Sequence, residues 1–421
     1  MAINIDELII YRNFENGDVL HDFVSAVNAG ENADRGVVYA AVGKLVELAG
    51  IYGFNGNLWQ NYLTLLIVNS ENAFSRACEL RTIQDGTLKR LAVHDFMSFR
   101  ELFNCRLKIP GDVCESAVIE QLLDYKRVEG AGRAFNKRIR DCICELSSRL
   151  AESRSIDEFT DNITDFYRRF GSGKLGLHKA FRIVDGEIVP ITNIAHVRLD
   201  DLVGYESAKK QLTDNTEAFL RGKGANNCLL YGDAGTGKAS SIKAILNKYY
   251  DDGLRIIEVY KHQFKYINDV IAQIKDRRYK FILYMDDLSF EEFETEYKYL
   301  KAVLEGNLEK KPQNILIYAT SNRRHLIKES FSDRDGWSGD VHKTETVQEK
   351  LSLAARFGVK IYFGSPDKKQ FGNIVLELAR RDGVTMPENE LLLEANRWEL
   401  SHGGFSGRTA RQFVDYLLGQ Q

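Results

Sequence analysis

Hydrophobic residues recur at two different spacings along this chain. Over residues 1–175 they fall three and four positions apart, as in 37–48 and 139–150, which is the period of helices with one buried face. From residue 226 onwards, short apolar runs alternate with stretches of helical spacing. Such alternation is typical of a parallel sheet that helices cover on both faces. The pattern therefore predicts an all-helical N-terminal domain followed by an α/β domain.

The α/β part contains apolar runs that are short enough to be buried strands. They cover residues 228–231, 255–260, 280–287, 314–320 and 359–363. Beyond residue 367 only helical spacing remains, over 371–382, 389–400 and 409–418. This tail predicts a small helical lid after the sheet.

A hairpin signal lies between the two halves. Residues 181–191 read FRIVDGEIVPI, with β-type residues on both sides of Asp185 and Gly186. An Asp-Gly pair in this setting favours a two-residue hairpin turn. We therefore expect four segments, namely a helical domain at 1–175, a hairpin connector at 176–198, an α/β core at 199–365 and a helical lid at 366–421.

Composition and charge narrow the classes of protein to which this chain could belong. A net charge of −3 over 421 residues gives no overall basic field, which argues against non-specific nucleic-acid binding. No segment has the 18 or so uncharged apolar residues of a membrane span, and the acidic N-terminus does not resemble a signal peptide. The six cysteines form no C-x-x-C pair, as expected for reduced thiols. These features predict a soluble, cytoplasmic protein.

The most specific local signal is the stretch NCLLYGDAGTGKASSI at residues 227–242. An apolar run leads into a glycine-rich turn, Lys238 and a helical pattern, which is the G-x-x-x-x-G-K spacing of a P-loop. Glycines let successive N–H groups curl around a phosphate, and the helix start adds its own N–H groups. On the motif alone, an ordinary glycine-rich βα turn is the alternative. The residues expected to contact the phosphates are Gly232, Asp233, Ala234, Gly235, Thr236, Gly237, Lys238, Ala239 and Ser240.

A pair of carboxylates ends the apolar run at 281–285. A carboxylate at the C-terminal end of a buried strand beside the P-loop strand can hold Mg²⁺, and we assign Asp286 to this task. Asp287 is placed to polarise the attacking water, and Glu291 is a second candidate for that base. The alternative is an Asp pair that only caps the helix that follows.

Three further polar positions complete the candidate site. Asn322 follows the apolar run at 314–320, where a side-chain amide can bond a γ-phosphate and the attacking water. Arg356 precedes the last strand, and Arg408 opens the final helix with Arg411 one turn later. Guanidinium groups stabilise a transferring phosphoryl group when a neighbouring subunit or a closing lid supplies them. For each arginine, a surface salt bridge is the alternative.

In this order the motifs resemble those of the AAA+ ATPases. They resemble more closely a family of bacterial predicted AAA+ ATPases that is grouped as a domain of unknown function. The resemblance extends from about Leu199 to the C-terminus and rests on LDDLVGYE, NTEAFL, the P-loop, MDDLSFE, ATSNRRHL, LSLAARFG and FSGRTARQF. It implies a P-loop NTPase core of AAA+ type with a five-stranded parallel sheet, and a site for ATP and Mg²⁺.

The resemblance also implies a role for each candidate residue. Lys238 contacts the phosphates and Asp286 the metal, Asn322 is sensor 1, Arg356 is an arginine finger acting on a neighbouring subunit, and Arg408 is the sensor 2 of the lid. The chain departs from the family at Ala239, where the pattern has a Ser whose hydroxyl is a direct Mg²⁺ ligand. Ser240 is one residue later and about 100° around the helix, so it is a poor substitute.

These features leave two functions open. One is an ATP-hydrolysing motor that remodels an unknown protein partner as a homo-oligomer. The other is an ATP-binding switch or adaptor with little turnover, which Ala239 and Asp287 favour. Nucleic-acid handling has weaker support, since only the basic run RAFNKRIR at 133–140 suggests it and no helix-turn-helix signature is present. We interpret the adjacent His94 and Asp95 as surface or packing residues.

Overall fold

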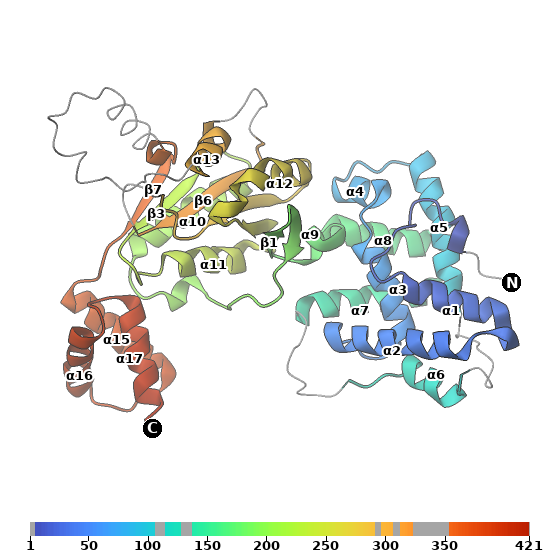
Figure 1. Cartoon of the computed structure of the whole chain (residues 1–421), viewed down its shortest axis with the longest axis horizontal. Helices are drawn as coiled ribbons and strands as arrows, with labels where there is room; N and C mark the ends of the chain where they lie inside the picture. The colour runs from blue at the N-terminus through green and yellow to red at the C-terminus, as the bar shows by residue number, and fades with distance from the viewer. Residues whose placement is uncertain are drawn as a thin grey trace. The chain divides into compact units, whose positions relative to one another are not determined.

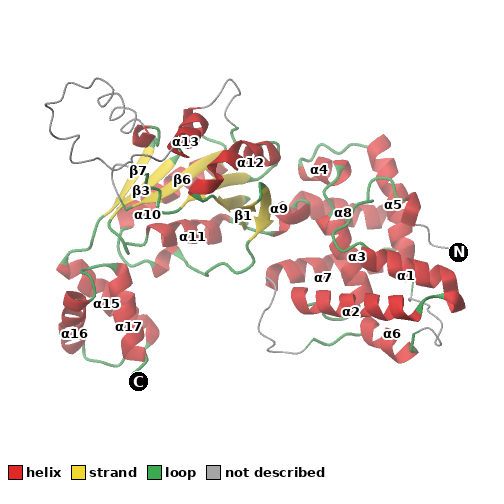
Figure 2. Ribbon diagram, in the orientation of Figure 1, coloured by secondary structure: helices red, strands yellow, loops and turns green. Residues whose placement is uncertain are grey.

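The computed structural model describes residues 5–105, 114–127, 137–290, 296–305, 312–322 and 353–420. The chain divides into two compact units, residues 1–178 and 179–421 (Figure 1). The first unit is helical, and the second holds the sheet and the C-terminal helices (Figure 2). The expected Glu291 and residues 133–136 of the basic run lie outside the described residues. No described helix is both long enough and apolar enough to pass through a bilayer.

The N-terminal unit packs its helices around a central one. Helix α3 (Leu58–Asn69) is buried along almost its whole length, because it is apolar on every side rather than on one face. The indole N–H of Trp59, in this helix, donates to the carbonyl of Leu102 at 2.9 Å. The other helices of the unit are α1 (Asp18–Ala29), α2 (Arg35–Tyr52), α4 (Ala73–Glu79), α5 (Thr87–Asn104), α6 (Ser116–Leu123), α7 (Lys137–Glu152), α8 (Ile156–Phe170) and α9 (Gly173–Leu177).

Asp95 is one of the few charged side chains buried in this unit. Its carboxylate, on α5, accepts the backbone N–H groups of Ile9, Ile10 and Tyr11 at 2.9, 2.7 and 2.9 Å. The neighbouring His94 is half exposed and contacts the same carboxylate at 3.2 Å. Asp95 therefore ties the N-terminal segment to α5, which agrees with the packing interpretation of this pair.

The second unit is built on one sheet of order β2-β1-β4-β5-β6-β3-β7. Its strands are β1 (Ala180–Val184), β2 (Glu187–Pro190), β3 (Cys228–Gly232), β4 (Leu254–Glu258), β5 (Lys280–Met285), β6 (Ile315–Ser321) and β7 (Val359–Phe363). Only the β1–β2 pair is antiparallel. Strand β6 lies between β5 and β3, so the C-terminal ends of these three strands meet at one edge of the sheet.

The predicted hairpin forms, and the sheet that it joins has seven strands where five were expected. Strand β1 pairs in parallel with β4, with Ala180 opposite Ile256, and so extends the sheet to seven strands. Without the hairpin, β4 would leave a row of backbone donors and acceptors at an open edge. The side-chain amide of Gln263 adds a bond to the carbonyl of Ile183 at 2.8 Å. The hairpin is therefore part of the core.

Helices cover both faces of this sheet. Helices α10 (Glu206–Leu220) and α11 (Lys238–Tyr249) share one apolar cluster with alternate residues of the strands, such as Leu230 and Ile282. Figure 1 shows α12 (Ile267–Ile274) and α13 (Glu296–Glu305) on the opposite face. Because both faces are covered, β6 is buried at every residue.

The C-terminal helices form a small bundle with its own core. They are α15 (Lys368–Asp382), α16 (Glu388–Ser401) and α17 (Gly407–Leu418). Phe371, Leu391 and Phe413 are among the side chains that meet between them. Ser406 caps α17 by accepting the N–H of Thr409 at 3.0 Å. This cap fixes the residue at which α17 begins.

Candidate functional site: a P-loop cavity under the helical lid

The P-loop joins β3 to α11, as the sequence predicts. Gly235 and Gly237 have φ angles of 76° and 93°, in the left-handed region that favours glycine. A side chain at Gly235 would approach Ser406 Oγ and the Cβ of Arg408 to 3.0 Å. The loop therefore needs glycine at this position both for its turn and for its contact with the lid.

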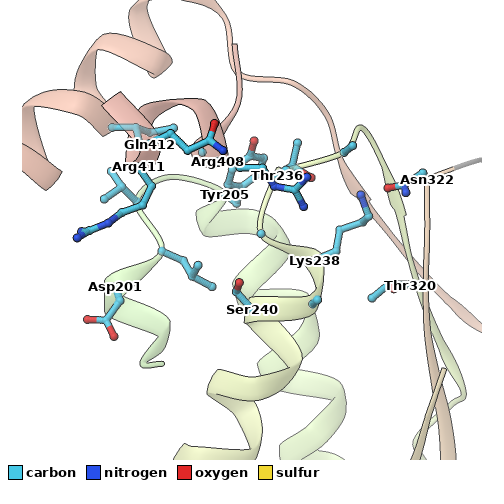
Figure 3. Close-up of a pocket in the computed structure, with 18 of the residues that line it drawn as sticks. Asp201, Tyr205, Thr236, Lys238, Ser240, Thr320, Asn322, Arg408, Arg411 and Gln412 are labelled. Carbon is cyan, nitrogen blue, oxygen red and sulfur yellow. The ribbon is translucent and has the colours of Figure 1, made fainter. Parts of the chain in front are cut away.

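Lys238 begins α11 and is buried. Its Nζ donates to the carbonyls of Gly232 at 3.0 Å and Asp233 at 2.6 Å. Burial lowers the pKa of this ammonium group, the nearby carboxylates act in the opposite direction, and the charge of Arg408 adds to the lowering. In Figure 3 the side chain extends toward the strand ends that carry Thr320 and Asn322. A cation held in this way is suited to receive an anionic group.

The two carboxylates after β5 are joined to the end of β6 by hydrogen bonds. The Oγ1 of Thr320 bonds Asp286 Oδ1 at 2.5 Å and accepts the N–H of Asp287 at 2.9 Å. The amide of Asn322 donates to Asp287 Oδ1 at 2.8 Å. The structure thus brings together Asp286, Asp287 and Asn322, and it adds Thr320, which sequence reasoning missed.

The lid touches the P-loop through its backbone. The N–H of Arg408 donates to the carbonyl of Gly235 at 3.1 Å. The side chain of Arg408 lines the same cavity as Lys238. Arg411 also lines the cavity, but its guanidinium is engaged by Asp382 and Asp415, each at 2.7 Å. Of these two arginines, Arg408 is therefore the one that faces the P-loop.

A cavity of about 710 Å³ connects these groups. Most of the predicted site residues line it, namely Ala234, Gly235, Thr236, Gly237, Lys238, Ala239, Ser240, Asp286, Asp287, Asn322 and Arg408. Gly232 and Asp233 precede the lining part of the loop. Arg356 is half-buried and lies outside the cavity lining.

Sequence reasoning also missed one wall of the cavity. This wall consists of Asp201, Leu202, Val203 and Tyr205 before α10, together with Ile374 and Leu378 of the lid. The Tyr205 hydroxyl bonds the carbonyl of Gly364 at 2.9 Å, which fixes the wall to the end of β7. The segment VRLDDLVGYE was the available signal, because it joins the hairpin to the α/β core.

The lining residues fit a nucleotide with its metal ion. Backbone N–H groups of the loop, Lys238 and Arg408 supply donors and positive charge for phosphates, and Asp286 and Asp287 supply oxygen ligands. Across the described ranges, no cluster of three or more His, Cys, Asp or Glu side chains is arranged to hold a metal. Such a site suits Mg²⁺, which binds through one or two carboxylates, water and substrate phosphates.

Comparison with known proteins gives three findings. A family model described as "Protein of unknown function (DUF815)" matches residues 177–421. Over 74 residues the chain is 39% identical to the replication factor C large subunit of Staphylothermus marinus, and this match spans only 17% of either protein. Two point variants of RuvB from Thermotoga maritima match at 16% identity and a TM-score of 0.36, over 52% of this chain and 64% or 63% of theirs.

Proposed function

Because this chain belongs to the DUF815 family of AAA+ P-loop proteins, we propose that it binds ATP with Mg²⁺ and hydrolyses it. Hydrolysis takes place where subunits of a homo-oligomer meet. The result is conformational remodelling of a protein partner. The observation that carries this proposal is the single cavity in which Lys238, Asp286, Asn322 and Arg408 converge from four separate segments.

In the proposed mechanism, the P-loop and Lys238 bind and orient the phosphates. The ammonium group exchanges its bonds to the carbonyls of Gly232 and Asp233 for phosphate oxygens. Magnesium, when bound, neutralises charge on the phosphates, and Asp286 holds it. Arg408 contributes a second positive charge from the lid, near enough to Lys238 for its charge to lower the pKa of the Lys238 ammonium group.

Asp287 and Asn322 are the proposed groups for the attacking water. The Asn322 amide holds Asp287 Oδ1 at 2.8 Å, so a water molecule near this pair meets an acceptor and a donor together. Asp287 accepts the proton of the water as it attacks. Arg356 of one subunit stabilises the charge that develops on the phosphates bound by its neighbour.

Calorimetry with Mg²⁺-ATP and a steady-state phosphate-release assay test this proposal. The wild-type protein should bind Mg²⁺-ATP and release phosphate, and Lys238→Ala should lose both because it removes the buried cation. No heat on titration of the wild type would refute the nucleotide site itself.

The second candidate is an ATP-binding switch with little turnover. Ala239 lines the cavity where a hydroxyl would bind the metal, and Asp287 is shorter than glutamate. In this version the lid reports ATP binding through the bond between Arg408 and Gly235. Binding of Mg²⁺-ATP with phosphate release no faster than in Lys238→Ala would favour the switch and exclude the motor.

A further inference from the structure

Thr320 is the hydrogen-bonding hub at the metal side of the cavity. A carboxylate only accepts and an N–H only donates, so the Thr320 hydroxyl donates to Asp286 Oδ1 and accepts from Asp287. Its backbone carbonyl accepts the N–H of Leu288 at 2.7 Å. One residue of β6 thereby fixes three consecutive residues after β5.

These bonds saturate one oxygen of Asp286. Oδ1 accepts from Thr320, from the Tyr284 hydroxyl at 2.7 Å and from the N–H of Asp287 at 3.1 Å. Tyr284 is buried, and its hydroxyl is the donor in this bond because a carboxylate oxygen only accepts. Oδ2 has no hydrogen bond to any described residue. It is therefore the oxygen of Asp286 that is left for a cation.

The same hub holds Asp287 in an uncommon backbone conformation. Asp287 has a φ angle of 48°, which is unfavourable for a residue with a side chain. Its N–H is held by Thr320 and Asp286, and its side chain by Asn322. Without the Thr320 hydroxyl, this conformation loses the shorter of the two bonds to its N–H group.

We propose that Thr320, supported by Tyr284, is a positioning residue that builds the metal side of this nucleotide site. It turns Asp286 so that Oδ2 serves Mg²⁺, and it keeps Asp287 beside Asn322. This arrangement matters more here than in a P-loop with a hydroxyl after its lysine, because Ala239 gives the metal no ligand. The inference rests on the proposed function.

The test compares ATP affinity in Mg²⁺ with ATP affinity in EDTA, measured by calorimetry. Thr320→Val should reduce the gain in affinity that Mg²⁺ provides by about tenfold, since bonds to a charged acceptor are lost, while affinity in EDTA changes less than about twofold. Thr320→Ser keeps the hydroxyl and should therefore restore the wild-type ratio of ATP affinity in Mg²⁺ to ATP affinity in EDTA. Tyr284→Phe should lower the ratio in the same direction and tests the network if Thr320→Val does not fold.

Thr216→Val is the matched control. Thr216, like Thr320, is buried in the α/β core. Its hydroxyl bonds that of Tyr318 at 3.0 Å, yet it does not line the cavity. Its ratio should equal that of the wild type. An equal loss of affinity in both buffers for Thr320→Val, or no loss at all, would overturn the inference. Failure of the proposed function looks different, because the wild type would then give no heat in either buffer.

Discussion

Two adjacent residues, Lys238 and Ala239, determine which contacts the cavity offers to phosphate and metal. Lys238 is buried against two carbonyl oxygens, and burial lowers its pKa because the ammonium group is poorly solvated there. Such a group gains most when a phosphate replaces the carbonyls. Ala239, one residue later, offers the ligand no polar contact, because its methyl group lies where a metal ligand is expected.

Restoring that ligand gives a direct prediction. Ala239→Ser adds a hydroxyl to the cavity lining and should tighten Mg²⁺-ATP binding by about fivefold, with little change in EDTA. Calorimetry in the two buffers measures the effect. The control is Thr216→Val, because Thr216 is buried in the same α/β core but does not line the cavity, and this change should alter neither value. Equal affinities for Ala239→Ser and the wild type would show that the metal does not approach this position.

At the scale of elements, local motifs were predictable and pairings between distant segments were not. The P-loop was found because its glycines and Lys238 are adjacent in sequence. Thr320 was missed because its partners, Asp286 and Asp287, follow a different strand, and only the register of β5 against β6 brings them together. The hairpin was located, but its apolar pattern did not show that it would join β4.

A prediction for the hairpin concerns how much the side chains of β1 contribute to the stability of the second unit. Phe181 in β1 is fully buried, so Phe181→Ala should lower the free energy of unfolding of the second unit by about 3–5 kcal/mol. Val184 of the same strand is 42% exposed, and Val184→Ala should cost less than about 1 kcal/mol. Denaturant titration of both variants measures the difference. Similar losses would mean that β1 does not contribute its side chains to the core.

A second prediction at this scale concerns the N-terminal segment. Asp95→Ala removes the acceptor of three backbone N–H groups and should destabilise the first unit by about 3 kcal/mol. The same variant should expose residues 9–11 to faster amide hydrogen exchange. His94→Ala serves as the control because this side chain is half exposed, and it should leave exchange at residues 9–11 unchanged. Unaltered exchange in Asp95→Ala would contradict the anchoring role.

At the scale of the whole molecule, we propose that the site becomes complete only when subunits meet. Lys238 and Asp286 line the cavity of their own chain, whereas Arg356 does not. That one subunit supplies the nucleotide site and its neighbour the arginine finger was inferred from the family resemblance. Neither spacing nor composition indicates what an arginine outside the cavity contacts.

A mixing experiment tests whether Arg356 acts on the nucleotide site of a neighbouring subunit. Lys238→Ala and Arg356→Ala should each lack phosphate release alone, because one loses the site and the other the finger. Mixed in equal amounts, they should recover about a quarter of the wild-type rate, since a quarter of the interfaces pair an intact site with an intact finger. Light scattering with and without ATP reports whether mixed oligomers form. Mixed oligomers without recovered activity would exclude a finger that acts between subunits.

The contact between the lid and the P-loop has one more consequence. It joins the N–H of Arg408 to the carbonyl of Gly235, two main-chain groups, so it does not depend on which side chain occupies position 408. Evolution can therefore change the chemistry that α17 offers to the ligand while the helix stays mechanically linked to the loop beneath it. Proline at position 408 would remove the donor of this bond, and a side chain at position 235 would press against the lid.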